Sequence, residues 1–305
     1  MSRDRDVIVI GGGLVGCLVT RALAHEGRSV TLFEKGAELG RRASTAAAGM
    51  LSPQMEWAED MLPDSAAMLD LCVAARERWP AFATGLEAET GQALHYRDDG
   101  TLVVALTDRE AADLGERAAA QRRRGLRAEW LDADAARERE PGLSLAARGA
   151  LFLPDDHQVD PLPLMAGAAA SIVGRREIEV VTGTAVTAIE STGGRVTGVV
   201  TAGARAARGS TARRAEIVVL AAGAWSAAIE GLPRPLAVRP VKGQMAALRP
   251  SRIPIRHVVG GRGAYCVPRD DGRVVVGATV EDAGFDETVD PAAVEALVAA
   301  ASAAV

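Results

Sequence analysis

The 305-residue chain has few of the side chains that usually bind metals or form redox pairs. Its three cysteines, Cys17, Cys72 and Cys266, lie far apart without a Cys-x-x-Cys motif, and its four histidines show no ligand spacing. Widely spaced cysteines are typical of proteins from a reducing compartment. We therefore expect no metal site and a cytoplasmic location.

The sequence also lacks long hydrophobic runs and an excess of positive charge. No stretch approaches the roughly 20 apolar residues of a membrane span, and the charged N-terminal residues are unlike a signal peptide. A formal net charge of -5 argues against nucleic acid as a partner. With 48% hydrophobic and 25% charged residues, the chain belongs to the globular class and is long enough for two domains.

The N-terminal residues carry a pattern typical of a dinucleotide-binding β-α-β unit. An apolar run, Val7–Ile10, is followed by Gly11-Gly12-Gly13-Leu14-Val15-Gly16, a helical stretch to about His25 and a second apolar run, Val30–Phe33. Gly11 permits a tight turn, Gly13 lets the backbone approach a pyrophosphate, and Gly16 lets the helix pack close to the strand. The first helical turn presents N–H groups and partial positive charge to the phosphates.

Glu34 follows the second apolar run at the spacing that accepts hydrogen bonds from a ribose. An acid at this position disfavours the 2′-phosphate of NADP. The alternative interpretation is a glycine-rich turn in an ordinary β-α unit, but here strand, helix, strand and acid occur in order. We therefore predict an α/β fold with a Rossmann-like nucleotide-binding domain.

The remaining sequence predicts a second domain threaded through the first. We expect helices over residues 63–91, over 108–125 with Thr107 as the cap, and after Asp160-Pro161. Strands of the N-terminal kind reappear after residue 178, so the nucleotide-binding domain is expected to be discontinuous, comprising residues 1–50 and 150–230. The second domain, with a mixed or antiparallel sheet, would comprise residues 51–149 and 231–290.

Residues 42–53 form a run dominated by small side chains soon after the glycine pattern. Small residues allow the main chain to come within hydrogen-bond distance of a flat ring. A helix start packed against the sheet explains the same composition equally well. The residues alone leave both interpretations open.

Several further segments follow the β-α-β start in a fixed order. They are Ser44-Thr45-Ala46-Ala47-Ala48-Gly49-Met50, Val159-Asp160-Pro161, Val219-Leu220-Ala221-Ala222-Gly223-Ala224-Trp225-Ser226, Pro240-Val241-Lys242-Gly243-Gln244 and Tyr265-Cys266-Val267-Pro268-Arg269. Over nearly its whole length the sequence resembles the D-amino-acid oxidase (DAO) family of FAD-dependent oxidoreductases. The Ala-Ala-Gly-Met and Pro-Val-Lys-Gly segments resemble the glycine oxidases of that family most closely.

The resemblance implies a role for each residue that matches a family motif. Leu14 and Val15, with Gly11, Gly13 and Gly16, would lie against the pyrophosphate, and Glu34 and Lys35 would meet the adenosine ribose. The flavin end would be lined by Ser44, Thr45, Ala48, Gly49 and Met50. Val186 would contact the adenine through its backbone, and Ala222 and Gly223 would end a strand beside the cofactor. Tyr265 matches the tyrosine whose hydroxyl holds the substrate carboxylate; a half-buried strand aromatic is its alternative interpretation.

The implied activity is the oxidation of a small amino acid, glycine in the first place, to an imine and then glyoxylate. Ammonia and hydrogen peroxide are the other products, with noncovalent FAD as cofactor, O2 as acceptor and thiamine thiazole biosynthesis as the setting. A D-amino-acid or sarcosine dehydrogenase or oxidase of the same superfamily is an alternative, and so is a truncated, non-catalytic flavoprotein. An NAD dehydrogenase ranks behind these, because no nicotinamide-side catalytic pair is visible. The oligomeric state, including a homo-oligomer, stays open.

The end of the sequence departs from the family pattern. The family continues with a Gly-x-Arg-Pro strand, whose arginine binds the substrate carboxylate, and with a further helix. Here residues 291–305 resemble the start of a helix, with Asp290 as cap and Pro291 in the first turn, but without a C-terminal signal. We expect a truncated C-terminal helix and an impaired oxidase, and neither Arg262 nor Arg269 matches the missing arginine.

Overall fold

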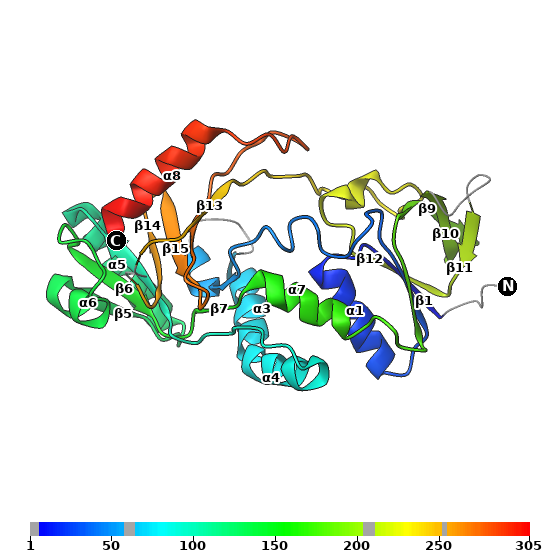
Figure 1. Cartoon of the computed structure of the whole chain (residues 1–305), viewed down its shortest axis with the longest axis horizontal. Coiled ribbons are helices and arrows are strands. Elements are labelled where there is room, and N and C mark those ends of the chain that lie inside the picture. The colour runs from blue at the N-terminus through cyan, green and yellow to red at the C-terminus, as the bar shows by residue number, and fades with distance from the viewer. Residues whose placement is uncertain (1–5, 58–64, 204–210, 252–254) are drawn as a thin grey trace. The chain divides into compact units, whose positions relative to one another are not determined.

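A computed structural model of the chain describes residues 6–57, 65–203, 211–251 and 255–305 (Figure 1). The chain divides into two units, each built from separate stretches of sequence and each described here by itself. Unit 1 takes the described residues of Met1–Ala47, Leu86–Ala93 and Pro161–Pro240, and unit 2 takes those of Ala48–Gly85, Leu94–Asp160 and Val241–Val305.

Unit 1 is centred on a parallel sheet with the strand order β12-β1-β2-β8. The strands are β1 (Val7–Ile10), β2 (Val30–Phe33), β8 (Ile178–Val181) and β12 (Ile217–Leu220). In register, Ile10 lies between Phe33 and Leu220. Every residue of β1 and β2 is buried, which is why these strands read as continuous apolar runs instead of alternating patterns.

Both faces of this sheet are covered. Helices α1 (Leu14–His25) and α7 (Pro161–Ala170) pack on one face through a cluster that includes Val9, Leu32 and Ala168. On the other face Ile8, Ile10 and Phe33 cluster with apolar residues of a three-stranded antiparallel sheet (Figure 1). Its strands are β9 (Thr184–Thr192), β10 (Arg195–Gly203) and β11 (Thr211–Arg214). The predicted Rossmann-like arrangement is therefore present.

The glycine turn between β1 and α1 has the close contacts that the sequence predicts. Gly11 has a φ of 109°, and a Cβ added there would lie 2.4 Å from the Ala221 carbonyl oxygen. A Cβ added at Gly16 would lie 1.8 Å from the Gly11 carbonyl oxygen. Only glycine permits this turn and this approach of helix to strand.

Unit 2 is centred on a mixed sheet with the strand order β13-β16-β15-β14-β4-β6-β5. Strands β14 (Val258–Gly261) and β4 (Thr101–Ala105) pair in parallel, whereas the other neighbours pair antiparallel. The remaining strands are β5 (Glu129–Asp132), β6 (Gly149–Leu153), β13 (Met245–Leu248), β15 (Ala264–Pro268) and β16 (Val274–Gly277). The expected mixed sheet is therefore observed.

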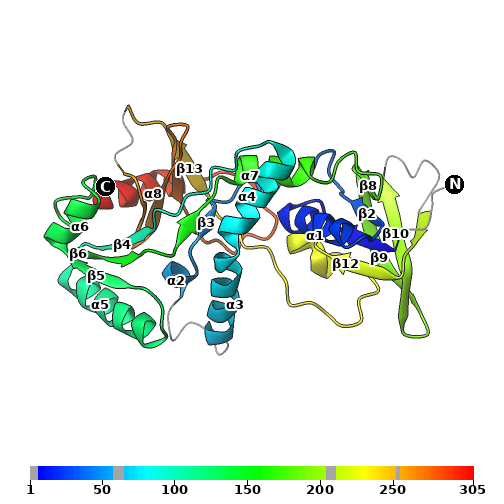
Figure 2. The same cartoon turned by 90° about the horizontal axis from the view of Figure 1, so that it is seen from below.

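Helices cover both faces of this sheet. On one face α8 (Pro291–Ala304) and α6 (Ala133–Arg139) pack in a cluster that includes Leu102, Phe152, Val276 and Leu297. On the opposite face α5 (Asp108–Arg123) packs on Val103 and Leu151. Figure 2 shows α5 and α6 on opposite sides of β5 and β6. A two-stranded sheet, β3 (Met50–Leu51) with β7 (His157–Gln158), belongs to the same unit.

A buried acid fixes the chain that leads into β14. Glu140, 2% exposed, accepts hydrogen bonds from the backbone N–H groups of Arg256 at 2.7 Å and His257 at 2.9 Å. The Nδ1 atom of His257 lies 3.0 Å from the same carboxylate. Burial raises the pKa of Glu140, but the hydrogen bonds from His257 and Arg256 outweigh burial and bring the pKa below its usual value.

The helix predicted over 63–91 is wrong in one respect, because the structure has two helices there. They are α3 (Ser65–Glu77) and α4 (Trp79–Thr90); α2 (Pro53–Glu56) precedes them. Pro80 stands in the first turn of α4, where proline is accepted, whereas inside a longer helix it would remove a hydrogen bond. The helix after Thr107 is confirmed, with reciprocal Thr107–Glu110 capping bonds, and α7 begins at Pro161 as expected.

The unit boundaries differ from the expected domain boundaries at four places. Residues 48–50 belong to unit 2. Residues 86–93 belong to unit 1, where Glu89 accepts hydrogen bonds from Arg21 at 2.7 Å and from Arg175. Residues 150–160 belong to unit 2, because β6 pairs with β4 and β5, and residues 231–240 belong to unit 1. Among the described helices, none combines the length and the apolar character that a membrane crossing requires.

Candidate functional site

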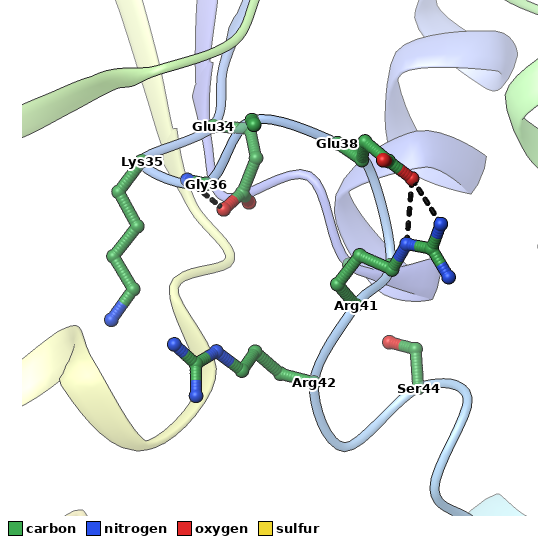
Figure 3. A pocket seen from close by; sticks show the side chains of 10 residues that line it. Glu34, Lys35, Gly36, Glu38, Arg41, Arg42 and Ser44 are labelled. Atoms are coloured by element: carbon green, nitrogen blue, oxygen red, sulfur yellow. Dashed lines mark hydrogen bonds and ion pairs between the residues drawn. The ribbon is translucent and has the colours of Figure 1, made fainter.

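Unit 1 contains a cavity of about 610 Å³ at the end of β2, beside the N-terminus of α1. It is lined by Gly13, Glu34, Lys35, Gly36, Ala37, Glu38, Gly40, Arg41, Arg42 and Ser44. Figure 3 shows the labelled residues, from Glu34 to Ser44, along the chain that follows β2. The volume lies within the range of small-molecule and cofactor pockets.

Glu34 closes one side of this cavity and ties two loops together. One carboxylate oxygen accepts a hydrogen bond from Gly12 N–H at 2.7 Å, and the other accepts one from Gly36 N–H at 2.7 Å. Each oxygen of a carboxylate has room for a further bond. Glu34 can therefore hold the glycine turn and still accept hydrogen bonds from a ribose.

The N-terminus of α1 forms a second side. Gly13 is the N-cap residue and supplies no side-chain cap, so the hydroxyl of Ser44 takes this place and accepts a hydrogen bond from Leu14 N–H at 2.9 Å. A Cβ added at Gly13 would come within 3.1 Å of the same hydroxyl oxygen. Backbone N–H groups at a helix N-terminus form an anion site, and Ser44 lies directly over it.

Basic side chains form the third side. The ammonium of Lys35 lies 3.1 Å from the ring centre of Trp225, and the guanidinium of Arg42 lies 5.8 Å from it. Figure 3 shows the ends of these two side chains converging. Arg41 instead pairs with Glu38, with Nε 2.6 Å from the carboxylate. Positive charge near a helix N-terminus suits a diphosphate.

These three features fit the ribose and diphosphate of a dinucleotide. The fit rests on a backbone cradle that a Cβ would fill, on an anion site capped only by a serine, and on a carboxylate with spare acceptor capacity. Among the described residues no group of three His, Cys, Asp or Glu side chains could hold a metal ion.

The other residues implied for unit 1 lie around the same strand ends. Thr45 donates a hydrogen bond to the Gly40 carbonyl at 2.8 Å, which holds the loop that carries Ser44. The side chain of Val186 lies in the apolar cluster under β1 and β2, and the contact expected of its backbone stays a prediction. Ala222 precedes a short 3₁₀ helix (Gly223–Ala228), and Gly223 has a φ of 55° with open space where a Cβ would lie.

Arg42 and Trp225 were missed as site residues by the sequence reasoning. Trp225 stands in a segment that carries the family resemblance, and Arg42 begins the small-residue run, two positions before another such segment. A cation paired with an aromatic ring across some 180 residues has no local signature. The signal that could have found them is their position within or next to two segments of the family resemblance.

Unit 2 brings together the second set of predicted residues around Tyr265 on β15. In register, Tyr265 lies between Gly260 on β14 and Gly277 on β16. A Cβ added at Gly277 would lie 2.4 Å from the tyrosine hydroxyl oxygen, so glycine is required for the ring to occupy this place. The two residues paired with Tyr265 on the neighbouring strands are therefore both glycines, which have no side chain beside the ring.

The hydroxyl of Tyr265 is available for a stronger partner. It donates a hydrogen bond to the Met245 sulfur at 3.4 Å, and a thioether is a weak acceptor that a carboxylate oxygen would displace. Burial and the charge of Glu56 raise the pKa of Tyr265, so the phenol keeps its proton at neutral pH. Half-burial on a strand and carboxylate binding are therefore compatible.

The segment Ala48–Met50 contributes to the same apolar cluster as Tyr265. Ala48 and Met50 share an apolar cluster with Tyr265, Val267 and Met245. Gly49 has a φ of 70°, which glycine adopts without strain. Residues 41–47 form turns and bends and residues 50–51 a strand, and a helix, α2, begins only at the end of this run, at Pro53.

The comparisons with known proteins agree with this geometry. The family model described as DAO, FAD dependent oxidoreductase, matches residues 6–305. A bifunctional protein ThiO/ThiG of Synechocystis sp. is 34% identical over 97% of this chain, and a glycine oxidase of Geobacillus kaustophilus is 33% identical over 95% of it. The chain spans 42% of the first protein's length and 74% of the second's.

The fold leads to the same group of proteins. The crystal structure of glycine oxidase from Geobacillus kaustophilus matches with a TM-score of 0.88 and 32% identity, over 100% of this chain and 79% of that one. The family match covers every described residue, and the cavity of unit 1 fits the ribose and diphosphate of a dinucleotide. The chain belongs to the DAO family of FAD-dependent oxidoreductases, as the sequence motifs predicted.

Proposed function

We propose that the chain oxidises glycine and supplies an intermediate of thiamine thiazole biosynthesis. In the overall reaction glycine, water and O2 become glyoxylate, ammonia and hydrogen peroxide. The observation that carries the proposal is the match to a named glycine oxidase over 95% of this chain. The ThiO/ThiG relative supports the thiamine setting.

The residues of unit 1 would bind the adenosine diphosphate half of FAD. Glu34 would accept hydrogen bonds from the ribose hydroxyls. Leu14 and Val15, in the first turn of α1, would face the diphosphate, with Leu14 N–H bonded to the Ser44 hydroxyl. Lys35 and Arg42 would add positive charge on the same side. FAD, when bound, supplies the acceptor for the two electrons that leave the amine.

Tyr265 would hold the substrate in unit 2. Its protonated hydroxyl would donate a hydrogen bond to the carboxylate of glycine in place of the Met245 sulfur. The small side chains of Ala48 and Gly49 would leave room for a compact amino acid. The protein's part is to bind and orient, because the cofactor carries the difficult chemistry.

The test is a spectrum of the purified chain followed by a peroxide assay. We expect the absorbance of an oxidised flavin, bleaching on anaerobic addition of glycine, and glycine-dependent peroxide in air. Sarcosine and D-alanine complete the panel. Faster bleaching by either would make it the substrate in place of glycine, and bleaching without peroxide, with electrons recovered on an artificial acceptor, would identify a dehydrogenase.

A further inference from the structure

Arg269 is a charged residue buried just after the end of β15, four positions after Tyr265. It is 4% exposed, and its own backbone is fixed because its N–H donates to the Arg273 carbonyl at 2.8 Å in the turn that follows. Burial lowers the pKa of Arg269. A buried guanidinium is unfavourable unless its donors are satisfied, so its partners show what the residue is for.

The partners of Arg269 are uncharged oxygens from two separate segments. One nitrogen donates to the Gln158 side-chain oxygen and to the Val159 carbonyl, each at 3.2 Å, and another donates to the Ala48 carbonyl. The planar fork of an arginine can bond several acceptors in fixed directions, which a lysine cannot do. Arg269 therefore links the backbone at Ala48 to the backbone at Val159.

The clamped backbone belongs to the segment that shares an apolar cluster with Tyr265. The Gly49 carbonyl accepts a hydrogen bond from Val159 N–H at 2.9 Å, and Met50 pairs with Gln158 between β3 and β7. Ala48, 7% exposed, and Met50 contact the cluster that holds the tyrosine ring. Without Arg269, the buried carbonyl of Ala48 would lose the donor that this side chain supplies.

We propose that Arg269 is a positioning residue of the substrate site: it fixes the Ala48–Met50 backbone against the strand of Tyr265 and so fixes the surroundings of the tyrosine hydroxyl. This inference rests on the proposed function, which gives carboxylate binding to Tyr265. Alanine and glycine side chains bury little area, so this segment depends on backbone hydrogen bonds for its position.

The experiment compares Arg269→Gln and Arg269→Lys with Arg262→Gln in the full chain loaded with FAD. Arg262 is the matched control, because it stands in the turn before the same strand with its side chain 86% exposed. Three quantities are measured: amide hydrogen exchange of residues 48–51 and 157–160, KM against kcat for glycine, and the global free energy of unfolding.

For Arg269→Gln we expect exchange of these two segments to rise by about tenfold or more beyond the change in the rest of unit 2. KM for glycine should rise by about tenfold, with a smaller change in kcat, because the tyrosine contacts a group that is charged throughout the reaction. Arg269→Lys should lie between this variant and wild type, and Arg262→Gln should match wild type.

Arg269→Gln with the exchange and the KM of Arg262→Gln would overturn the proposal. A uniform rise in exchange across unit 2 with unchanged KM would also overturn it, since Arg269 would then only stabilise the fold. If Arg269→Gln does not fold, the same comparison on Arg269→Lys decides. A wild-type protein that holds FAD and oxidises no amino acid would refute the proposed function, while the local exchange would still show whether Arg269 holds the segment.

Discussion

Replacing Glu34 with glutamine should weaken both the folded apoprotein and its binding of FAD, by separable amounts. The carboxylate accepts hydrogen bonds from Gly12 N–H and Gly36 N–H, both at 2.7 Å. Glutamine keeps one acceptor oxygen and turns an NH2 group toward the other N–H. One charge-assisted bond is therefore lost, which is worth about 1.5–3 kcal/mol of unfolding free energy.

The same change removes acceptor capacity from the ribose. Losing one charge-assisted hydrogen bond of similar strength corresponds to an increase of about 10–100-fold in the dissociation constant of FAD. Urea unfolding of the apoprotein, followed by circular dichroism, measures the first effect. Titration of the apoprotein with FAD, followed by quenching of flavin fluorescence, measures the second.

Glu38→Gln is the matched control for this experiment. Glu38 lines the same cavity, but its side chain is 61% exposed and pairs with Arg41 on the surface. Surface pairs contribute little to stability, so this variant should unfold and bind FAD almost as wild type does. If Glu34→Gln lost stability but bound FAD as well as Glu38→Gln, Glu34 would serve only the glycine turn, and the ribose contact would be refuted.

Three further predictions follow from the same structure. Acid precipitation should release the flavin into the supernatant, because we predict noncovalent FAD; colour in the pellet would contradict this. Tyr265→Phe should raise KM for glycine more than it lowers kcat, as steady-state kinetics can show, and a collapse of kcat alone would give Tyr265 a role in the chemical step. Glu140→Gln should lower the unfolding free energy by about 1.5–3 kcal/mol at neutral pH. The lowered pKa of Glu140 stabilises the fold above the unfolded-state pKa, and this contribution is lost as pH falls through the folded-state pKa. The two unfolding curves should therefore converge at acid pH.

The β-α-β unit could be predicted from the sequence because its determinants are local. Gly11 is required by its positive φ in the turn, and Gly16 by the approach of the helix to the Gly11 carbonyl at the end of its own strand. The strands β1 and β2 are buried on both faces, so their apolar runs are visible without knowledge of the partner strands. The same holds for the capping residue Thr107, whose partner is three positions away.

The features that escaped prediction depend on residues distant in sequence. Residues 86–93 join unit 1 because Glu89 meets Arg21, which is 68 positions away, and Arg175, which is 86 positions away. The sequence around Glu89 contains no pattern that predicts these partners. The structural role of Glu34 was not predicted either. Its spacing predicts a ribose contact but does not indicate that its carboxylate accepts hydrogen bonds from two backbone N–H groups.

The small-residue run depends on a hydrogen-bond donor from a distant part of the chain. Ala48 and Gly49 leave the backbone open to a flat ring or a compact substrate, but they bury little apolar area and cannot hold themselves in place. The carbonyl of the buried Ala48, directly before Gly49 with its positive φ, accepts a hydrogen bond from outside the segment. Arg269 supplies that donor from 221 positions further along the chain. An arginine that matches no expected substrate contact is therefore explained by the small residues, whose open backbone depends on it.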